Sequence, residues 1–189
     1  MRVSNISVLQ SDTVVLIHDA FKGLDYWKDF MTGGEPGAAM DIHIYQMFSD
    51  AEVSRTDDEH ISVACSQGTS LSSFHLWTIV GEWTPAPTDC AKYLNGRGRG
   101  ARYDGSYAGG DGFGDCSTKT GSGANFSPEY KAFLRKYWEA QTITYEKGAG
   151  WVQWTWKAEQ ADDWSYQAGL RHGWIPRNPA DRQYPNICK

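Results

Sequence analysis

Short apolar runs alternate along the chain with stretches of helical character. The runs are residues 14–17, 39–45, 76–80 and 151–156, all rich in β-branched or aromatic side chains. The helical stretches are residues 21–31, 57–66 and 87–94 and a longer one that begins at Ser127. Strands that alternate with helices predict parallel β/α units, whose strands are apolar because both of their faces are covered. We therefore expect an α/β domain.

The clearest helix signal lies in the second half of the chain. Ser127 can cap a helix, Pro128 suits its first position and Glu129 favours its first turn. A Gly-Ala-Gly sequence at 148–150 ends the pattern. Upstream, residues 96–126 are rich in glycine with few periodic apolar positions, so they predict a long loop, and loops of this length are usually functional or disordered. The apolar face of the helix consists of Tyr130, Phe133, Leu134, Tyr137 and Trp138, with Gln141 in line.

Composition narrows the functional classes. The 189 residues suit one globular domain, and their net charge of -5 argues against nucleic acid as a partner. No run approaches the roughly 18 apolar residues that cross a membrane. No signal-peptide core follows Met1, so an export signal would lie upstream. The 9 tryptophans and 10 tyrosines either fill a core or stack on sugar rings.

The four cysteines favour disulfides over a metal site. They are Cys65, Cys90, Cys116 and Cys188. None lies in a CxxC sequence, and no group of cysteines and histidines has the spacing of a zinc site. Four cysteines allow three full pairings, which spacing alone does not resolve. Disulfides point to an oxidising compartment, and we expect no metal.

The ends of the four runs carry the candidate chemistry. They read His18-Asp19, His43-Ile44-Tyr45, Gly81-Glu82-Trp83 and Trp154-Thr155-Trp156. In a β/α barrel the carboxyl ends of the strands meet at one face, where the reactive residues lie. A carboxylate, an imidazole, a phenol and an indole would cleave and support a sugar there. Structural interpretations compete: Glu82 as the first solvated residue after a strand, His43 as a core histidine, Tyr45 as an ordinary strand aromatic and Trp154 as a core side chain.

Seven longer motifs, in one order, span the chain from about residue 14 to Cys188. They are Val15-Leu16-Ile17-His18-Asp19-Ala20-Phe21, His43-Ile44-Tyr45-Gln46-Met47-Phe48, Gly81-Glu82-Trp83, Thr88-Asp89-Cys90-Ala91-Lys92-Tyr93-Leu94-Asn95-Gly96, Arg99-Gly100-Ala101-Arg102-Tyr103, Gly150-Trp151-Val152-Gln153-Trp154-Thr155-Trp156-Lys157 and Asp181-Arg182-Gln183-Tyr184-Pro185-Asn186. This set resembles the fungal exo-β-1,3-glucanases of glycoside hydrolase family 5.

The resemblance implies a (β/α)8 TIM barrel, of which residues 1–189 would supply strands five to eight as the carboxyl-terminal half of the catalytic domain. It implies a retaining hydrolase that releases glucose from the ends of β-1,3-glucan or its oligosaccharides, without a cofactor. The implied site residues are Glu82 as nucleophile, His43 and Tyr45 as its hydrogen-bonding partners, Trp154 beneath the cleaved sugar, and Phe48, Asn95 and Arg99 around the acceptor side and the mouth of the cleft.

The same resemblance extends to the cysteines and to the location of the protein. It implies the pairs Cys65–Cys188 and Cys90–Cys116, the second of which would clamp the glycine-rich loop. It also implies a protein outside the cell or in the cell wall. Preference for β-1,3- over β-1,6-linked glucan stays open. Residues 96–126 would form the rim that decides it, and their sequence does not indicate the specificity.

The chain departs from the family at the second carboxylate. The family's acid/base glutamate lies in an Asn-Glu-Pro motif at the end of strand four, and this chain has no such motif. Gly34-Glu35-Pro36 precedes the second run and would lie at the opposite, stability face, so we do not assign Glu35. The chain is then a piece of a longer enzyme, a half that assembles with an amino-terminal half-barrel, or a protein that only binds glucan. We expect little turnover from it alone.

Overall fold

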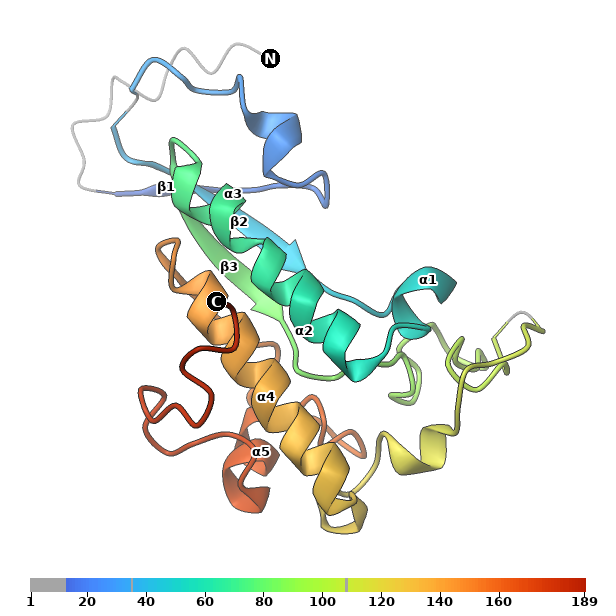
Figure 1. Ribbon diagram of the computed structural model, residues 1–189. Helices are drawn as coiled ribbons and strands as arrows, with labels where there is room; N and C mark the ends of the chain where they lie inside the picture. The colour runs from blue at the N-terminus through green and yellow to red at the C-terminus, as the bar shows by residue number, and fades with distance from the viewer. Residues whose placement is uncertain (1–12, 35, 108) are drawn as a thin grey trace.

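A sheet of four parallel strands forms the centre of the molecule. The computed structural model describes residues 13–34, 36–107 and 109–189, so Glu35 lies outside the described residues. The strands are β1 Val15–His18, β2 Ala38–Ile44, β3 Trp77–Trp83 and β4 Gly150–Trp151. Their order in the sheet is their order in the chain, and every neighbouring pair is parallel (Figure 1). The predicted α/β class is confirmed, and the sheet is consistent with part of a barrel.

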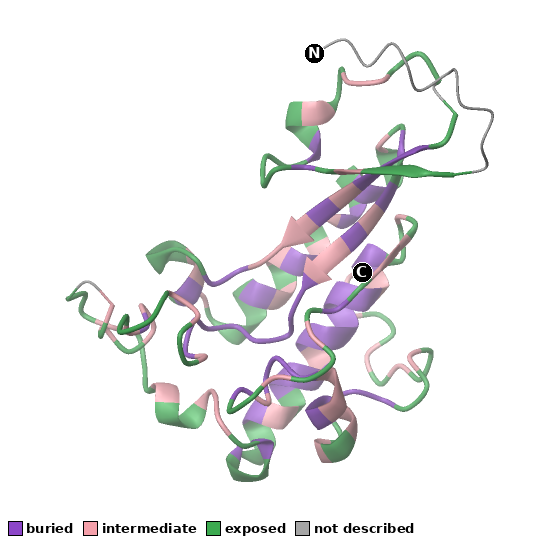
Figure 2. Cartoon of the chain, turned by 180° about the vertical axis from the view of Figure 1, so that it is seen from behind, coloured by how far each residue is buried: buried purple, intermediate pink, exposed green. Residues whose placement is uncertain are grey.

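Some of the helices of the described part cover one face of this sheet. The helices are α1 Asp50–Val53, α2 Asp57–Ser66, α3 Gly68–Ser73, α4 Pro128–Tyr145 and α5 Tyr166–His172, with 3-10 turns η2 Leu24–Trp27, η3 Cys116–Thr118 and η4 Gly123–Asn125. Helix α2 packs along α4 on one side of β2 and β3. Figure 2 shows the opposite side of these two strands bare of helices within the described part. None of the described helices is both long and apolar enough to cross a membrane.

The two best-supported helices begin where the sequence predicts. The side chain of Thr56 accepts a hydrogen bond from the backbone N–H of Glu59, whose own side chain accepts the Thr56 N–H, and this capping box begins α2. Ser127 caps α4 in the same way by accepting the N–H of Tyr130 at 3.1 Å, with Pro128 at the first position. The predicted helical stretch at 21–31 is only the short turn η2.

The helix predicted at residues 87–94 is wrong. Tyr93 has a φ of 69°, which a right-handed helix does not allow. The buried carboxylate of Asp89 instead accepts the backbone N–H groups of Arg102 at 2.8 Å and Tyr103 at 3.1 Å. A side chain that binds the backbone of the following loop thus organises this segment, and the apolar spacing alone does not reveal such a contact.

The fourth strand is shorter than the run at 151–156 predicts, because β4 ends at Trp151. The backbone N–H of Trp154 still donates to the carbonyl of Trp83 at 2.8 Å, so the chain continues beside β3. The next N–H turns away and donates to the carbonyl of Trp164 at 3.1 Å. The aromatic character of this run therefore reflects side chains placed at the end of the sheet rather than a long strand.

The hydrophobic core lies between the sheet and α4, and it sets which strand residues face the open side. It includes Met40, Val80, Trp83, Leu134 and Trp138, each with no exposed surface. Because side chains alternate along a strand, the burial of Met40 and Ile42 turns Asp41 and His43 to the face that no helix covers.

Candidate active site

Three of the predicted polar side chains converge at the carboxyl ends of β2 and β3. The Oε2 of Glu82 accepts a hydrogen bond from the Tyr45 hydroxyl at 2.9 Å and lies 3.3 Å from Nδ1 of His43. The side chain of Glu82 is 31% exposed and that of His43 is 14% exposed. The protein thus holds one oxygen of a carboxylate that remains open to solvent, so these residues are neither core side chains nor a simply solvated strand end.

A bulge in β3 turns Glu82 toward His43. As far as Ile42, which lies opposite Val80, the two strands pair residue for residue. The register then shifts by one, so that Glu82 and not Gly81 lies opposite His43. Without the extra residue Glu82 would point to the helix-covered face, because successive side chains point to opposite faces. The bulge therefore creates the contact, as bulges beside active sites often do.

The same register shift fixes the end of β3. It points Trp83 to the helix-covered face, where the indole has no exposed surface. The ring lies edge to face against Tyr145 at 5.5 Å and against Trp151 at 5.4 Å between ring centres. A large anchored side chain directly after Glu82 restricts the backbone that carries the carboxylate.

Tyr45 is a permanent hydrogen-bond donor to Glu82. Burial raises the pKa of its phenol well above the usual value near 10, and the hydrogen bond to Glu82 and the negative charge of that carboxylate raise it further. The phenol therefore keeps its proton near neutral pH and donates it to this hydrogen bond.

Further side chains surround His43. Asp41, which the sequence analysis missed, places its Oδ2 3.2 Å from Nε2 of His43. The only signal in the sequence is its position two residues before His43, on the same face of the strand. The rings of His18 and Phe21 lie 4.1 Å and 5.6 Å from that of His43. Asp19 is buried and accepts backbone N–H groups of the turn after β1, so it organises that turn.

A cleft of about 560 Å³ opens beside this group. Phe21, His43, Tyr45 and Phe48 line it together with Gln67, Ser70 and Leu71 from the helix-covered side, whereas Glu82 and Trp154 are not among its lining residues. Phe48 is 45% exposed, and its ring lies edge to face with that of Tyr45 at 5.5 Å, so the structure brings this predicted residue to the site. Within the described residues, no three His, Cys, Asp or Glu side chains are grouped so as to hold a metal ion.

Trp154 lies at the end of the sheet with half of its surface open. Its backbone N–H donates to the carbonyl of Trp83, the residue after Glu82, and its peptide bond to Thr155 is cis. The residue is 51% exposed, which excludes the core interpretation for this indole.

Comparison with known proteins points to one group of enzymes. A probable glucan 1,3-β-glucosidase A of Aspergillus niger is 43% identical over 188 residues, covering 98% of this chain and 45% of the relative. Glucan 1,3-β-glucosidase I/II of Saccharomyces cerevisiae is 43% identical over 95% of this chain and 41% of its own length. A Blumeria graminis glucan 1,3-β-glucosidase is 44% identical over 95% and 43%. No protein-family model matches the chain.

The chain is homologous to fungal glucan 1,3-β-glucosidases. The resemblance that its motifs carry is thus confirmed. The chain spans less than half the length of these glucosidases.

The loop that follows β3 holds two of the residues predicted by analogy with the glucosidases. The amide nitrogen of Asn95 donates to Asp89 at 2.8 Å, and its oxygen accepts from the guanidinium of Arg102 at 2.8 Å. Arg99 is exposed. Among the described residues, neither Asn95 nor Arg99 forms a hydrogen bond or ion pair with Glu82. Asn95 serves first to fold the loop, together with Arg102.

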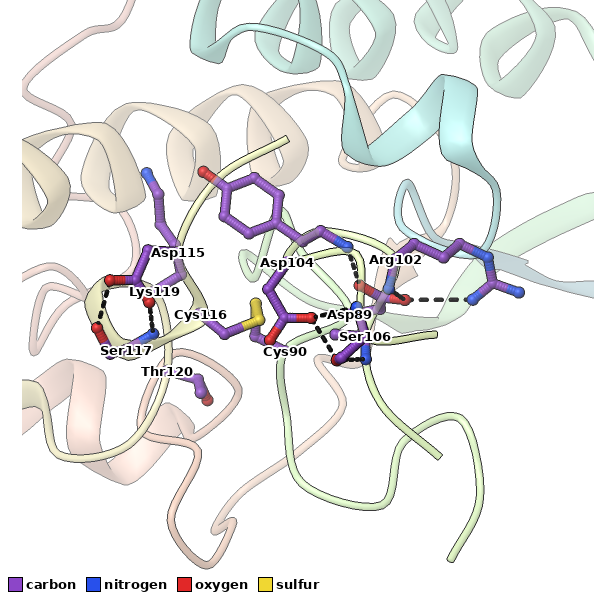
Figure 3. Close-up of a disulfide and its surroundings, with 12 residues drawn as sticks. Asp89, Cys90, Arg102, Asp104, Ser106, Asp115, Cys116, Ser117, Lys119 and Thr120 are labelled. Carbon is purple, nitrogen blue, oxygen red and sulfur yellow. Dashed lines mark hydrogen bonds and ion pairs between the residues drawn. A yellow bond between two sulfur atoms is a disulfide. The ribbon is translucent and has the colours of Figure 1, made fainter. Parts of the chain in front are cut away.

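A disulfide fastens this loop close to the site. Cys90 pairs with Cys116, and Figure 3 shows the bond beside the ion pair of Asp89 and Arg102. The other bond joins Cys65 to Cys188, so both pairs are those that the resemblance implies. The Cys90–Cys116 bond thus ties the segment before the glycine-rich loop to a residue within that loop.

The far end of the loop is fastened to the segment before α5. Thr120 donates to Asp163 at 2.9 Å, and the backbone N–H of Gly123 donates to Asp162 at 2.8 Å. Asp163 has no exposed surface, and its second carboxylate oxygen has no hydrogen-bonding partner among the described residues. Burial raises the pKa of Asp163 to about 7, against the opposing effect of the Thr120 hydroxyl.

This buried acid predicts a pH-dependent stability. The folded protein keeps the proton of Asp163 between about pH 4 and pH 7, whereas the unfolded chain releases it, so the free energy of unfolding falls as the pH rises through this window. Asp163→Asn removes the effect. Relative to this variant, the wild type should lose up to about 4 kcal/mol between pH 4 and pH 8. Urea denaturation of both proteins at the two pH values measures the difference.

The exposed Asp25 supplies the control for this comparison. Asp25→Asn should track the wild type at both pH values, because its carboxylate is almost fully solvated. A gap between wild type and Asp163→Asn that is the same at pH 4 and pH 8 would show that Asp163 is ionised in the folded protein throughout.

Proposed function

We propose that this chain carries the nucleophile of a retaining exo-acting β-1,3-glucan hydrolase, which releases glucose from the ends of glucan chains. One observation supports this most directly. In a chain homologous to glucan 1,3-β-glucosidases, Glu82 stands at a strand end with Oε2 held by the Tyr45 hydroxyl and facing His43. Among the described residues, Oε1 has no hydrogen bond or ion pair, so it is free to attack.

The proposed mechanism has two steps. Oε1 of Glu82 attacks the anomeric carbon, while a carboxylic acid about 5 Å away protonates the departing glycosidic oxygen. The glucosyl–enzyme ester is then hydrolysed by water, from which the same acid, now a carboxylate, takes a proton. The proton donor is a glutamate of a polypeptide segment that this chain does not contain, since the chain has no Asn-Glu-Pro motif.

Two exposed aromatic side chains, those of Trp154 and Phe48, suit the proposed substrate. Trp154 would lie beneath the sugar that is cleaved, and Phe48 would face the acceptor side. Asn95 and Arg99 would act at the mouth of the cleft, through the loop that carries them. The choice between β-1,3- and β-1,6-linked glucan would fall to the same loop. Two disulfides suit a protein that works outside the cell or in the cell wall.

We further propose that the four strands are strands five to eight of a (β/α)8 barrel. Both edges of the sheet, β1 and β4, lack a neighbouring strand among the described residues. Val15, Leu16 and Trp77 are 39%, 54% and 73% exposed, an unusual state for apolar strand residues. Four further strands would pair with both edges and bury these side chains. The relatives, of which the chain covers 41–45%, are long enough to contain them.

Reconstitution tests the proposal. The chain is produced together with the part of the Saccharomyces cerevisiae relative that it does not match, either as two polypeptides or joined in one. Laminarin is the substrate, and proton NMR follows the anomer of the released glucose. We expect glucose to appear first as the β-anomer, because two inversions retain configuration. Each half alone should release none.

The competing function is glucan binding without catalysis, which the exposed rings of Phe48 and Trp154 favour. Here the chain alone would be retained on immobilised laminarin, and a reconstituted complex of both halves would form without releasing glucose. A well-folded complex that releases no glucose would therefore overturn the catalytic proposal and leave the binding function.

A further inference from the structure

Asp41 lies against the bulge that creates the site. It is on β2, two residues before His43 and on the same face, and its side chain is 20% exposed. A Cβ added to Gly81 would lie 2.0 Å from Oδ1 and 2.8 Å from Cγ of Asp41. Gly81 does not have a positive φ, so its backbone would accept alanine. Glycine is needed at this position for the space that the Asp41 carboxylate occupies.

The carboxylate is held there with an incomplete set of partners. Oδ2 faces His43, whereas Oδ1 is buried and has no hydrogen-bonding partner among the described residues. A buried carboxylate oxygen without a partner is costly, so the position is not explained by the stability of Asp41 itself. The contact of Oδ2 with His43 is the interaction that accounts for the position of this carboxylate.

The imidazole of His43 lies between two carboxylates. Nε2 is 3.2 Å from Oδ2 of Asp41, and Nδ1 is 3.3 Å from Oε2 of Glu82. A carboxylate only accepts, and a neutral imidazole carries one N–H, so a neutral ring can donate to only one of them. Nε2 lies in hydrogen-bonding geometry with Asp41, and Nδ1 faces Glu82 at ion-pair distance, so each ring nitrogen is directed at a carboxylate oxygen, which favours a proton on both. The geometry therefore matches an imidazolium with one negative charge on each side.

We propose that Asp41 is a positioning residue, which holds His43 as an imidazolium whose Nδ1–H points at Glu82. The Tyr45 hydroxyl then donates to Oε2 of Glu82 while the charged ring faces the same oxygen, which leaves Oε1 to react. The catalytic meaning of this inference rests on the proposed function, whereas the arrangement itself does not. Two other groups face the ring: His18, whose Nε2 lies 3.5 Å from Asp19, and the uncharged ring of Phe21.

The first test uses the chain as it is. Nitrogen-15 NMR of the histidine rings near neutral pH reports whether each ring nitrogen carries a proton, and His43→Gln assigns the signals of His43 among the five histidines. We expect both nitrogens of His43 to be protonated. A single protonated nitrogen in the wild type would overturn the proposal without any substitution at Asp41.

Two substitutions displace the carboxylate in different ways. Asp41→Asn removes its charge and keeps its shape, whereas Gly81→Ala pushes the charged group aside. In both, we expect His43 to lose one ring proton, so that one nitrogen signal moves to the unprotonated range. Glu129→Gln, at an exposed carboxylate in the first turn of α4, should leave the spectrum unchanged. If Asp41→Asn folds and His43 keeps both protons, Asp41 does not hold the ring.

A kinetic measurement separates positioning from a general structural effect. In the reconstituted enzyme, Asp41→Asn should lower kcat by about 10- to 100-fold, by analogy with carboxylates that orient metal-ligating histidines, with little change in KM. If reconstitution yields no activity while the ring signals respond to Asp41→Asn, the proposed function fails and the arrangement stands. If activity appears and the ring signals do not respond to Asp41→Asn, the proposed function stands and the role of Asp41 fails.

Discussion

Glu82→Gln should lower kcat for the release of glucose from laminarin by at least about 10³-fold in the reconstituted enzyme, which corresponds to about 4 kcal/mol of transition-state stabilisation. Glutamine keeps the shape of the side chain and can still accept from Tyr45, but its amide is not a nucleophile toward the anomeric carbon. We expect KM to change little, because the proposed sugar contacts of Trp154 and Phe48 remain. Steady-state kinetics with laminarin measures both constants.

The control for this variant is a carboxylate of the same type far from the cleft. Glu129 is exposed in the first turn of α4, and Glu129→Gln should retain full activity. A second variant, Glu82→Ala, leaves a space in which azide can replace the carboxylate, so added azide should restore turnover and yield glucosyl azide. A Glu82→Gln enzyme that retains more than a tenth of wild-type kcat would remove Glu82 from the role of nucleophile.

The convergence of the three polar residues could be predicted because it follows from topology. His43, Tyr45 and Glu82 each come at the end of an apolar run, and parallel strands bring such ends to one edge. A core histidine does exist, but it is His60 and not His43. His60 is buried against Phe133 and Tyr137, and burial lowers its pKa to about 4.

The details that make the site work could not be predicted. The run at 76–80 and the residues after it give no sign that Gly81 forms a bulge, yet the bulge decides the face on which Glu82 lies. Asp41 was missed for the same reason, because its importance depends on the register of the neighbouring strand. Likewise, the spacing at 87–94 favoured a helix, since the buried contact of Asp89 with a loop 13 residues later is not local.

Removal of the Cys65–Cys188 disulfide should lower the free energy of unfolding by about 5 kcal/mol, the largest stability effect that we expect. The bond closes a loop with a sequence separation of 123, which strongly restricts the unfolded chain. In the folded protein the carboxyl-terminal segment has other attachments: the buried Glu139 accepts the backbone N–H groups of Gln183 and Tyr184 at 2.8 Å and 2.6 Å. Urea denaturation of the variant with Cys65→Ser and Cys188→Ser measures the loss.

The second disulfide is the matched control for the cause of this loss. Cys90–Cys116 has a sequence separation of 26, so the variant with Cys90→Ser and Cys116→Ser should lose only about 3.5 kcal/mol. The effects on activity should rank the two variants the other way. The Cys90–Cys116 disulfide fastens the loop that follows Glu82, so its removal should raise KM for laminarin in the reconstituted enzyme. Equal or reversed stability losses would show that contacts in the folded state, and not the entropy of the unfolded chain, account for the stabilisation.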